Sequence, residues 1–216
     1  MGELVVYGAS GFGQQVMFWV EDAVEAGARF EVAGYVDDDP AAHREVRSGY
    51  PVLGDRGWLR RHAAEREIAV VLGLAGPTVK ERIVAELSEA GVEFATVAHP
   101  SAVISRHASL GKGVVVGPGN VVSVGVRLDE FATVNTACTI GHDARVDAYA
   151  TLLPGVNVSG AVSVGQGVSV GTGAAIVQGV TIGPGTTVGA GATVVSDLPG
   201  GCVAVGTPAR PRERDR

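Results

Sequence analysis

Aliphatic residues recur at every sixth position through the second half of the chain. A second column of mostly small residues lies two positions before each of them. Because residues i and i−2 of an extended strand share a face, each hexad predicts a short strand with two inward side chains, followed by a turn. A helix would need spacings of three and four, which this segment lacks. The sixteen aliphatic positions are Ile104, Leu110, Val116, Val122, Leu128, Val134, Ile140, Val146, Leu152, Val158, Val164, Val170, Ile176, Ile182, Val188 and Val194.

Three such hexads close one triangular coil, so the series predicts an all-β parallel β-helix of about five coils stacked roughly 4.8 Å apart. Glycines such as Gly111 and Gly171 directly follow aliphatic positions, where the chain turns or neighbouring coils approach closely. The composition, with 32 glycines and only 5% aromatic residues, suits a repetitive solenoid better than a globular core.

The first half of the chain alternates between strand and helix patterns. Residues 3–8 predict a buried strand that runs into the turn GASGFG and a helix over about 14–26. A second strand over 30–36 and a third over 68–76 follow, with another helix from about 78 to 90. This alternation predicts a small parallel α/β sheet of Rossmann-like type. We therefore expect two domains, residues 1–97 and residues 98–216.

The first strand–helix turn is a candidate phosphate site. Glycines at 8, 11 and 13 let amides at a helix N-terminus approach a diphosphate, and Asp37, at the end of the second strand, can bind ribose hydroxyls. The spacing is GxxGxG and not the dinucleotide GxGxxG, so NAD is weakly supported. Glycines in a tight turn without a ligand are the alternative reading of Gly8, Gly11 and Gly13.

The formal net charge of −6 argues against a nucleic-acid or anionic-membrane partner and favours small molecules. No run of about 18 apolar residues is present, so we expect a soluble, cytoplasmic protein. Cys138 and Cys202 are too few for a zinc pair or a disulfide framework, and we expect both to be reduced and structural. The stretch 148–196 carries no charged residue, which favours a surface covered by another subunit; a neutral surface in water is the alternative.

Three motifs carry a resemblance that spans nearly the whole chain: YGASGFG, GYVDDDP and, inside the hexads, NTACTIGHD. Together they resemble the sialic-acid O-acetyltransferase family, which includes the bacterial nucleotide-amino-sugar N-acetyltransferases. The resemblance implies left-handed coils, a homotrimer, a nucleotide sugar held by the first domain and acetyl-CoA held by the β-helix. Many members have His where this chain has Phe12, which leaves the nucleotide and the sugar open. By matching motif, the nucleotide would contact Gly8, Ala9, Ser10, Gly11, Asp37 and Asp38.

His142 is the candidate general base, since it alone of five histidines sits well inside the repeat. Acyl transfer from a thioester needs a base for the attacking amine or hydroxyl, and imidazole titrates in a suitable range. Asp143, its neighbour, can fix the tautomer and stabilise the imidazolium. The resemblance assigns the same roles and makes Asn135 a substrate-positioning residue, while a second histidine of some members falls at Thr151. A solvent-exposed histidine without a role is the alternative.

Coenzyme A already carries an activated acyl group, so no nucleophilic residue is required, and we expect no metal. We expect a backbone N–H near Gly160 to donate to the thioester oxyanion. Coenzyme A should extend toward the C-terminal coils, with Thr172 and Arg210 as further contacts. Arg210 would meet a phosphate, although a solvated charged tail is equally compatible with its position.

The predicted function is acetyl transfer from acetyl-CoA to the amino group of a nucleotide-linked sugar. A hydroxyl acceptor, as in a sugar O-acetyltransferase, is the first alternative. A zinc carbonic anhydrase on the same β-helix would need three His ligands, and the chain has no HxxxxH pair. A non-catalytic scaffold that binds a nucleotide sugar is the third alternative.

Overall fold

A six-stranded sheet forms from the first half of the chain. This computed structural model describes residues 2–43, 45–63 and 67–212. The elements are β1 (Glu3–Tyr7), α1 (Gly11–Glu25), β2 (Glu31–Val36), the 3-10 helix η1 (Pro40–Ala42), β3 (Val46–Arg47), β4 (Tyr50–Gly54), α2 (Arg56–Ala63), β5 (Ile68–Leu72), α3 (Pro77–Glu89) and β6 (Glu93–Phe94). Strand order is β3-β4-β2-β1-β5-β6, parallel except for the β3–β4 hairpin. The three predicted strands and two predicted helices are confirmed, whereas the hairpin, α2 and β6 were not predicted.

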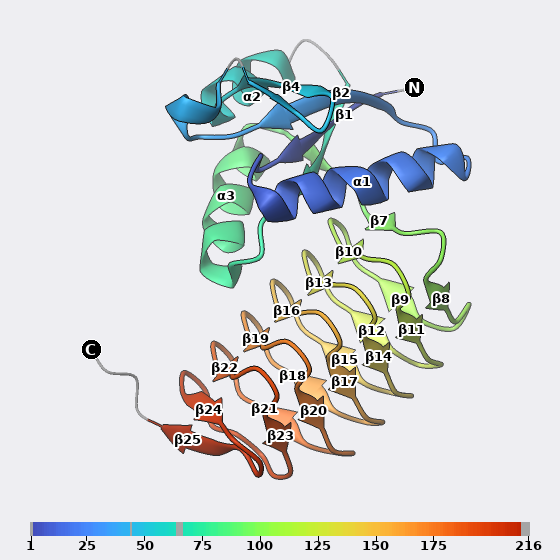
Figure 1. Cartoon of the computed structure of the whole chain (residues 1–216), viewed down its shortest axis with the longest axis vertical. Coiled ribbons are helices and arrows are strands. Elements are labelled where there is room, and N and C mark those ends of the chain that lie inside the picture. Colours follow the sequence, from blue (N-terminus) through green and yellow to red (C-terminus); the bar gives the residue numbers. More distant parts are fainter. Residues whose placement is uncertain (1, 44, 64–66, 213–216) are drawn as a thin grey trace.

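Side chains of β1 alternate between the two faces of this sheet. Leu4 and Val6 pack in one apolar cluster with α1, and Val5 and Tyr7 pack in another with α3. Helices on both faces are what a parallel sheet with crossover connections requires. In Figure 1, α1 lies between this sheet and the coils below it.

A left-handed parallel β-helix follows, in which β8 to β23 each end at one of the sixteen aliphatic positions. Paired strands are eighteen residues apart, as in Thr133↔Thr151. The predicted repeat and coil number are therefore confirmed. The strands are β7 (Val97–Ala98), β8 (Val103–Ile104), β9 (Ser109–Leu110), β10 (Val115–Val116), β11 (Val121–Val122), β12 (Arg127–Leu128), β13 (Thr133–Val134), β14 (Thr139–Ile140), β15 (Arg145–Val146), β16 (Thr151–Leu152), β17 (Asn157–Val158), β18 (Ser163–Val164), β19 (Ser169–Val170), β20 (Ala175–Ile176), β21 (Thr181–Ile182), β22 (Thr187–Val188), β23 (Thr193–Val194), β24 (Val203–Val205) and β25 (Arg210–Arg212).

The prism has three walls. Wall 1 contains β7, β10, β13, β16, β19, β22, β24 and β25; wall 2 contains β8, β11, β14, β17, β20 and β23; wall 3 contains β9, β12, β15, β18 and β21. The aliphatic positions form one core inside the prism and are buried except Ile104 and Leu110, which are partly buried in the first coil. Neighbouring coils approach closely after these positions, since a Cβ at Gly171 would lie 2.4 Å from the Ala190 nitrogen.

The six-stranded sheet and its helices, which we call the α/β half, pack on wall 1. We call this contact the junction. Val97 and Val115 of wall 1 join the apolar cluster under α1, and the Trp19 ring lies where a Cβ at Gly117 would meet it at 2.8 Å. At the corner between walls 3 and 1, the Phe131 ring packs against Phe94, with centroids 5.1 Å apart. The α/β half therefore covers β7, β10, β13 and β16 of wall 1 and leaves the last strands of that wall uncovered (Figure 1).

Lys80 of α3 is fully buried in the junction, although it is a lysine. Its Nζ contacts neutral oxygens of wall 1 and the adjoining corner. Burial disfavours the charged form and lowers the pKa of Lys80 to about 7.

We expect the junction to become more stable as the pH rises from 7 to 9. An unfolded lysine has a pKa of about 10.4, so the unfolded chain binds more protons than the folded one in this range, and stability rises with pH. Urea unfolding of the wild type and of Lys80→Met at pH 7, 8 and 9 measures the effect. The wild type should gain stability relative to the variant, and parallel pH profiles would show that burial does not lower the pKa of Lys80.

Both cysteines are free, and Cys138 lies in the core of the prism, where burial raises its pKa to about 11. The predicted structural role of Cys138 is confirmed. Among the helices within residues 2–43, 45–63 and 67–212, none has the length and apolar character needed to cross a membrane.

Candidate active site

His142 lies in the turn between β14 and β15, at the corner where wall 2 meets wall 3. Its Nδ1 lies 2.9 Å from Asp143 Oδ2, so the predicted pair is formed. Asp143 has a φ of 59°, a left-handed conformation that aspartate adopts more readily than most residues. With Nδ1–H donating to the carboxylate, Nε2 is the nitrogen able to take a proton. Both side chains are more than half exposed, so a substrate can reach them.

Gly160 occupies the same corner one coil later. A Cβ at this position would lie 2.5 Å from His142 Nε2, so any side chain here would crowd the basic nitrogen. The Gly160 carbonyl accepts from Gly179 N–H at 3.0 Å, within the backbone ladder of the coils. The structure thus brings the predicted base and the predicted oxyanion donor together.

The other residues predicted around the acyl donor lie elsewhere in this chain. Asn135 and Thr172 follow β13 and β19, at the corner between walls 1 and 2. Asn135 is buried, and its Oδ1 accepts from Thr136 N–H at 2.7 Å. Arg210 is on β25, where its Nη1 donates to the Ala209 carbonyl at 3.2 Å; residues 213–216 of the predicted tail lie outside the described residues. Within one chain, none of the three adjoins the corner of His142.

A pocket of about 340 Å³ lies at the N-terminus of α1, and it brings together Ala9, Ser10 and Asp37. Ser10 is the N-cap residue of α1, and its side chain does not cap the helix. Amides of a first helical turn and the helix dipole favour an anion. The pocket is therefore suited to a phosphate group.

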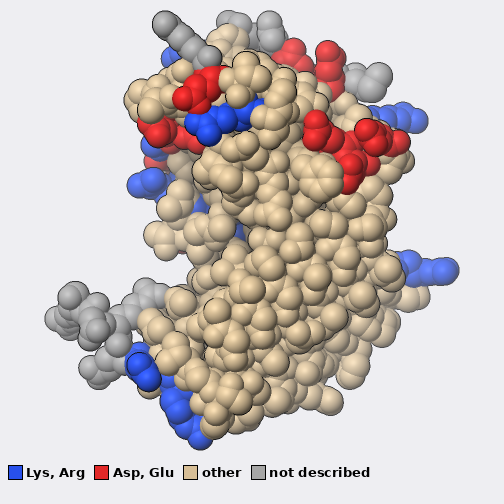
Figure 2. Space-filling view, in the orientation of Figure 1, with Lys and Arg blue, Asp and Glu red and all other residues tan. Residues whose placement is uncertain are grey.

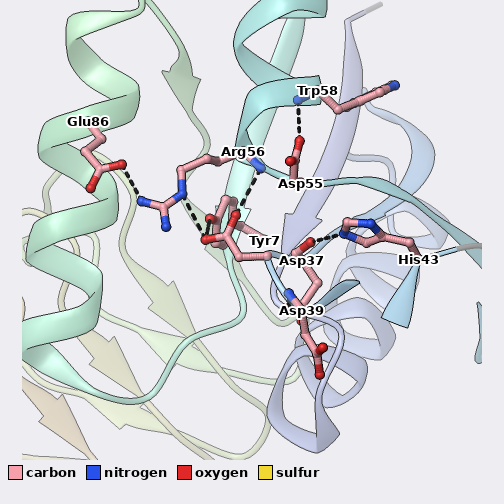
Figure 3. A network of polar contacts seen from close by, with 9 residues as sticks. Tyr7, Asp37, Asp39, His43, Asp55, Arg56, Trp58 and Glu86 are labelled. Atoms are coloured by element: carbon pink, nitrogen blue, oxygen red, sulfur yellow. Dashed lines mark hydrogen bonds and ion pairs between the residues drawn. The ribbon is translucent and has the colours of Figure 1, made fainter. Parts of the chain in front are cut away.

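Asp37 joins the first turn of the sheet to the end of β2. Its Oδ2 accepts from Ala9 N–H at 2.7 Å and its Oδ1 from Asp39 N–H at 2.9 Å. His43 Nε2 lies 2.7 Å from the Asp37 carbonyl oxygen (Figure 3). Because each carboxylate oxygen can accept more than one hydrogen bond, Asp37 can also accept from a ligand hydroxyl at the pocket.

Asp38, predicted to contact the nucleotide, is engaged within the protein. Its Oδ2 accepts from Tyr7 Oη at 2.6 Å and from Arg56 Nε at 3.0 Å. Arg56 also pairs with Glu86 of α3 (Figure 3). Burial, followed by the bond to Asp38, raises the pKa of Tyr7. This network ties β1, β2, α2 and α3 together, so the structure gives Asp38 a bracing role.

Gly13 and Gly8 owe their identity to packing. A Cβ at Gly13 would lie 1.8 Å from the Gly8 carbonyl oxygen, and Gly8 has a φ of 106°. Gly13 is also buried, so the close passage of α1 over the end of β1 explains it without a ligand. By contrast, a Cβ at Gly11 would meet nothing within 4 Å.

Known proteins share this architecture over the whole chain. Residues 3–87 match the family model of the PglD N-terminal domain. The structure of PerB from Caulobacter crescentus, solved with CoA and GDP-perosamine, is 31% identical and has a TM-score of 0.90, covering 98% of each chain. The acetyltransferase domain of PglB from Neisseria gonorrhoeae is also 31% identical, with a TM-score of 0.88, and 98% of this chain covers 100% of it.

The chain belongs to the nucleotide-amino-sugar N-acetyltransferase family. A GDP-perosamine N-acetyltransferase from Escherichia coli O157:H7 is 27% identical over 157 residues, which cover 73% of this chain and 70% of that enzyme. The predicted resemblance and the predicted two-part fold are thus confirmed.

Arg47 is a pocket residue of this N-acetyltransferase family member that sequence reasoning missed. It is the only cation among the residues that line the pocket, alongside Asp39 and Ala42. Its guanidinium pairs with Glu45, and its Nε has no partner within the described part of the chain. Arg47 lies on the unpredicted β3–β4 hairpin, so no pattern pointed to it. Phe12, at the position of departure, packs edge-on against Trp19, with centroids 5.9 Å apart.

Proposed function

We propose that this protein transfers the acetyl group of acetyl-CoA to the amino group of a nucleotide-linked sugar. Residues 1–97 hold the nucleotide and residues 98–216 hold the acetyl donor. The observation that carries the proposal is the His142–Asp143 pair, with Gly160 beneath it, in a chain that aligns along 98% of its length with a relative solved with CoA and GDP-perosamine.

In the proposed reaction, the sugar amine attacks the thioester carbonyl while His142 Nε2 takes a proton from the amine nitrogen. Asp143 keeps Nδ1 protonated and stabilises the imidazolium as it forms. The N–H of Gly160 donates to the oxyanion of the tetrahedral intermediate. Collapse of the intermediate breaks the carbon–sulfur bond, and the departing thiolate takes the proton from the imidazolium. The products are the N-acetylated sugar nucleotide and free coenzyme A.

Topology supports a homotrimer whose active site lies between subunits. The proposed nucleotide pocket belongs to the half that packs on the first strands of wall 1, whereas His142 occupies the corner opposite that wall. A nucleotide in the pocket would therefore meet the His142 of a neighbouring copy. Asn135 and Thr172, at the corner between walls 1 and 2, would then approach the site from the copy that holds the sugar.

The surface supports the same assembly. Val103 and Val121 of wall 2 are exposed, and so are Val177 and Val195 in the turns that follow it. Figure 2 shows acidic side chains on the α/β half, whereas most of the visible β-helix surface is uncharged. An uncharged wall with exposed valines is suited to contact with another subunit.

We propose GDP-perosamine as the first substrate to test, since it is the sugar nucleotide bound or acted on by two relatives. In the pocket, the α1 N-terminus and Arg47 would face the diphosphate, and Asp37 the ribose. The cytoplasm, where acetyl-CoA is available, is the proposed location.

An assay with acetyl-CoA and a panel of GDP-, UDP- and dTDP-linked amino sugars tests the function through release of free thiol. We expect turnover with at least one amino sugar and an amide product by mass spectrometry. The matched control replaces the amine of the best substrate with a hydroxyl. Acetylation of that analogue alone would identify an O-acetyltransferase, and no thiol release with any acceptor would overturn the proposal.

A further inference from the structure

The amino group of Lys80 contacts four oxygen atoms of the β-helix across the junction. Its Nζ lies 3.0 Å from the Phe131 carbonyl, 3.0 Å from Thr133 Oγ1, 2.9 Å from Thr151 Oγ1 and 3.4 Å from the Ala150 carbonyl. All four acceptors are neutral and belong to the β-helix. One side chain of the α/β half thus lies within hydrogen-bonding distance of four positions on the prism, and its ammonium form can donate to three of them at a time.

These four positions mark the two ends of one coil. Thr133 in β13 and Thr151 in β16 are paired neighbours on wall 1, one full coil apart. His142 lies midway along the chain between them, nine residues from each. Lys80 therefore contacts both the start and the end of the coil that carries His142.

The segment before α3 also takes part in these contacts. Thr151 Oγ1 donates to the Ala75 carbonyl at 2.9 Å, while it accepts from Lys80. Hydrogen bonds to hydroxyls and carbonyls of the prism thus define both the position and the rotation of α3. Apolar packing is non-directional, so it would allow α3 to slide or rotate where these hydrogen bonds do not.

The need to hold α3 against the β-helix does not by itself explain a lysine at position 80. Burying an amino group without a carboxylate partner is unfavourable, and an apolar side chain would hold the same surfaces together. Lys112 and Glu93 form another lysine contact across the junction, at 3.3 Å, but both side chains are well exposed. Such exposed pairs contribute little. Among these two lysines, Lys80 is the one whose bonds constrain orientation.

We propose that Lys80 is a positioning residue that fixes the orientation of the nucleotide-sugar half on the coil carrying His142. This inference rests on the proposed function. With the halves rigidly oriented, three-fold assembly delivers each sugar amine to a neighbouring His142 at a constant position. Loss of the Lys80 bonds lets the α/β half rock on wall 1, and misplacement of reacting groups by about 1 Å can lower a rate severely.

The test compares Lys80→Met, which keeps the length of the side chain without its donors, with Lys112→Met as the matched control. Two measurements are made on the full chain: amide hydrogen exchange along α3, and kcat per folded active site with affinities for coenzyme A and for the sugar nucleotide. In Lys80→Met we expect faster exchange in α3 and a kcat lowered about tenfold or more, with both affinities within about twofold of the wild type. Lys112→Met should match the wild type in every measurement.

The outcomes separate orientation from stability. Unchanged amide exchange in α3 would show that the Lys80 hydrogen bonds do not hold α3 on the prism, whatever the activity. Faster exchange with an unchanged kcat per folded site would overturn the positioning role. If Lys80→Met does not fold, Thr133→Val removes one acceptor and should show both effects to a smaller degree; its absence of effect would equally overturn the proposal. A wild type inactive with every acceptor would overturn the proposed function. Amide exchange in α3 would then be the test of whether the Lys80 hydrogen bonds hold α3 on the prism.

Discussion

Replacing His142 with alanine should lower kcat for acetyl transfer by at least about a hundredfold, the usual scale for loss of a general base. The imidazole is half exposed and its bond is to its neighbour Asp143, so its removal leaves the coil ladder intact. The backbone bonds around it, such as Ala161 N–H to the His142 carbonyl at 2.7 Å, do not depend on the side chain. Thiol release at saturating acetyl-CoA and sugar nucleotide measures the loss.

His107→Ala is the matched control for this experiment. His107 occupies the same corner of the prism near its first coils, is exposed, and has no place in the proposed chemistry. It should retain wild-type turnover, and both variants should unfold at the wild-type temperature. A His142→Ala enzyme with unchanged kcat would remove the proposed base and with it the reaction scheme.

Gly13→Ala should lower the free energy of unfolding by about 3 kcal/mol or more, at the upper end of overpacking effects. The new methyl would lie 1.8 Å from the Gly8 carbonyl oxygen, and both groups belong to rigid backbone. Helix α1 would have to move away from β1 and therefore toward wall 1, where Trp19 already packs closely on Gly117 (Figure 1). Urea unfolding of the full chain provides the measurement.

Gly11→Ala, at the first residue of the same helix, is the control for Gly13→Ala. It meets nothing within 4 Å and lies in a helix, so it should leave stability unchanged or raise it by up to about 1 kcal/mol. Equal midpoints for Gly11→Ala and Gly13→Ala would show that α1 does not pass β1 as closely as the structure has it.

The repeat could be predicted because its cause is local. Each hexad places its aliphatic residue and the small residue before it on one face of a two-residue strand, and the same requirement recurs in every coil. Val134 and Leu152, one coil apart in the series, are buried for the same reason. The His142–Asp143 pair was predictable in the same way, since its members are adjacent in the chain.

The hairpin β3–β4 was not predicted because its sequence carries only a weak strand pattern. Its first strand has only two residues, it lies at the edge of the sheet, and Pro51 falls within its second strand. A proline argues against a strand that pairs on both sides, as β4 does with β3 and β2. Arg47 was missed together with the hairpin that carries it. Gly13 and Asp38 were predicted as ligand contacts, and the sequence did not reveal the close approach at Gly13 or the polar contacts of Asp38 within the protein.

The sequence by itself determined the coils, the two halves and the chemical identity of the candidate base, because those features depend on neighbours a few residues away. Only the tertiary structure decided that the pocket at the N-terminus of α1 and His142 lie on different sides of the prism, and that Lys80 contacts both ends of the coil that carries His142. Lys80 and Thr151 are 71 residues apart in the chain. Contacts of that kind arise from how two folded surfaces dock, and no periodicity along the chain records that docking.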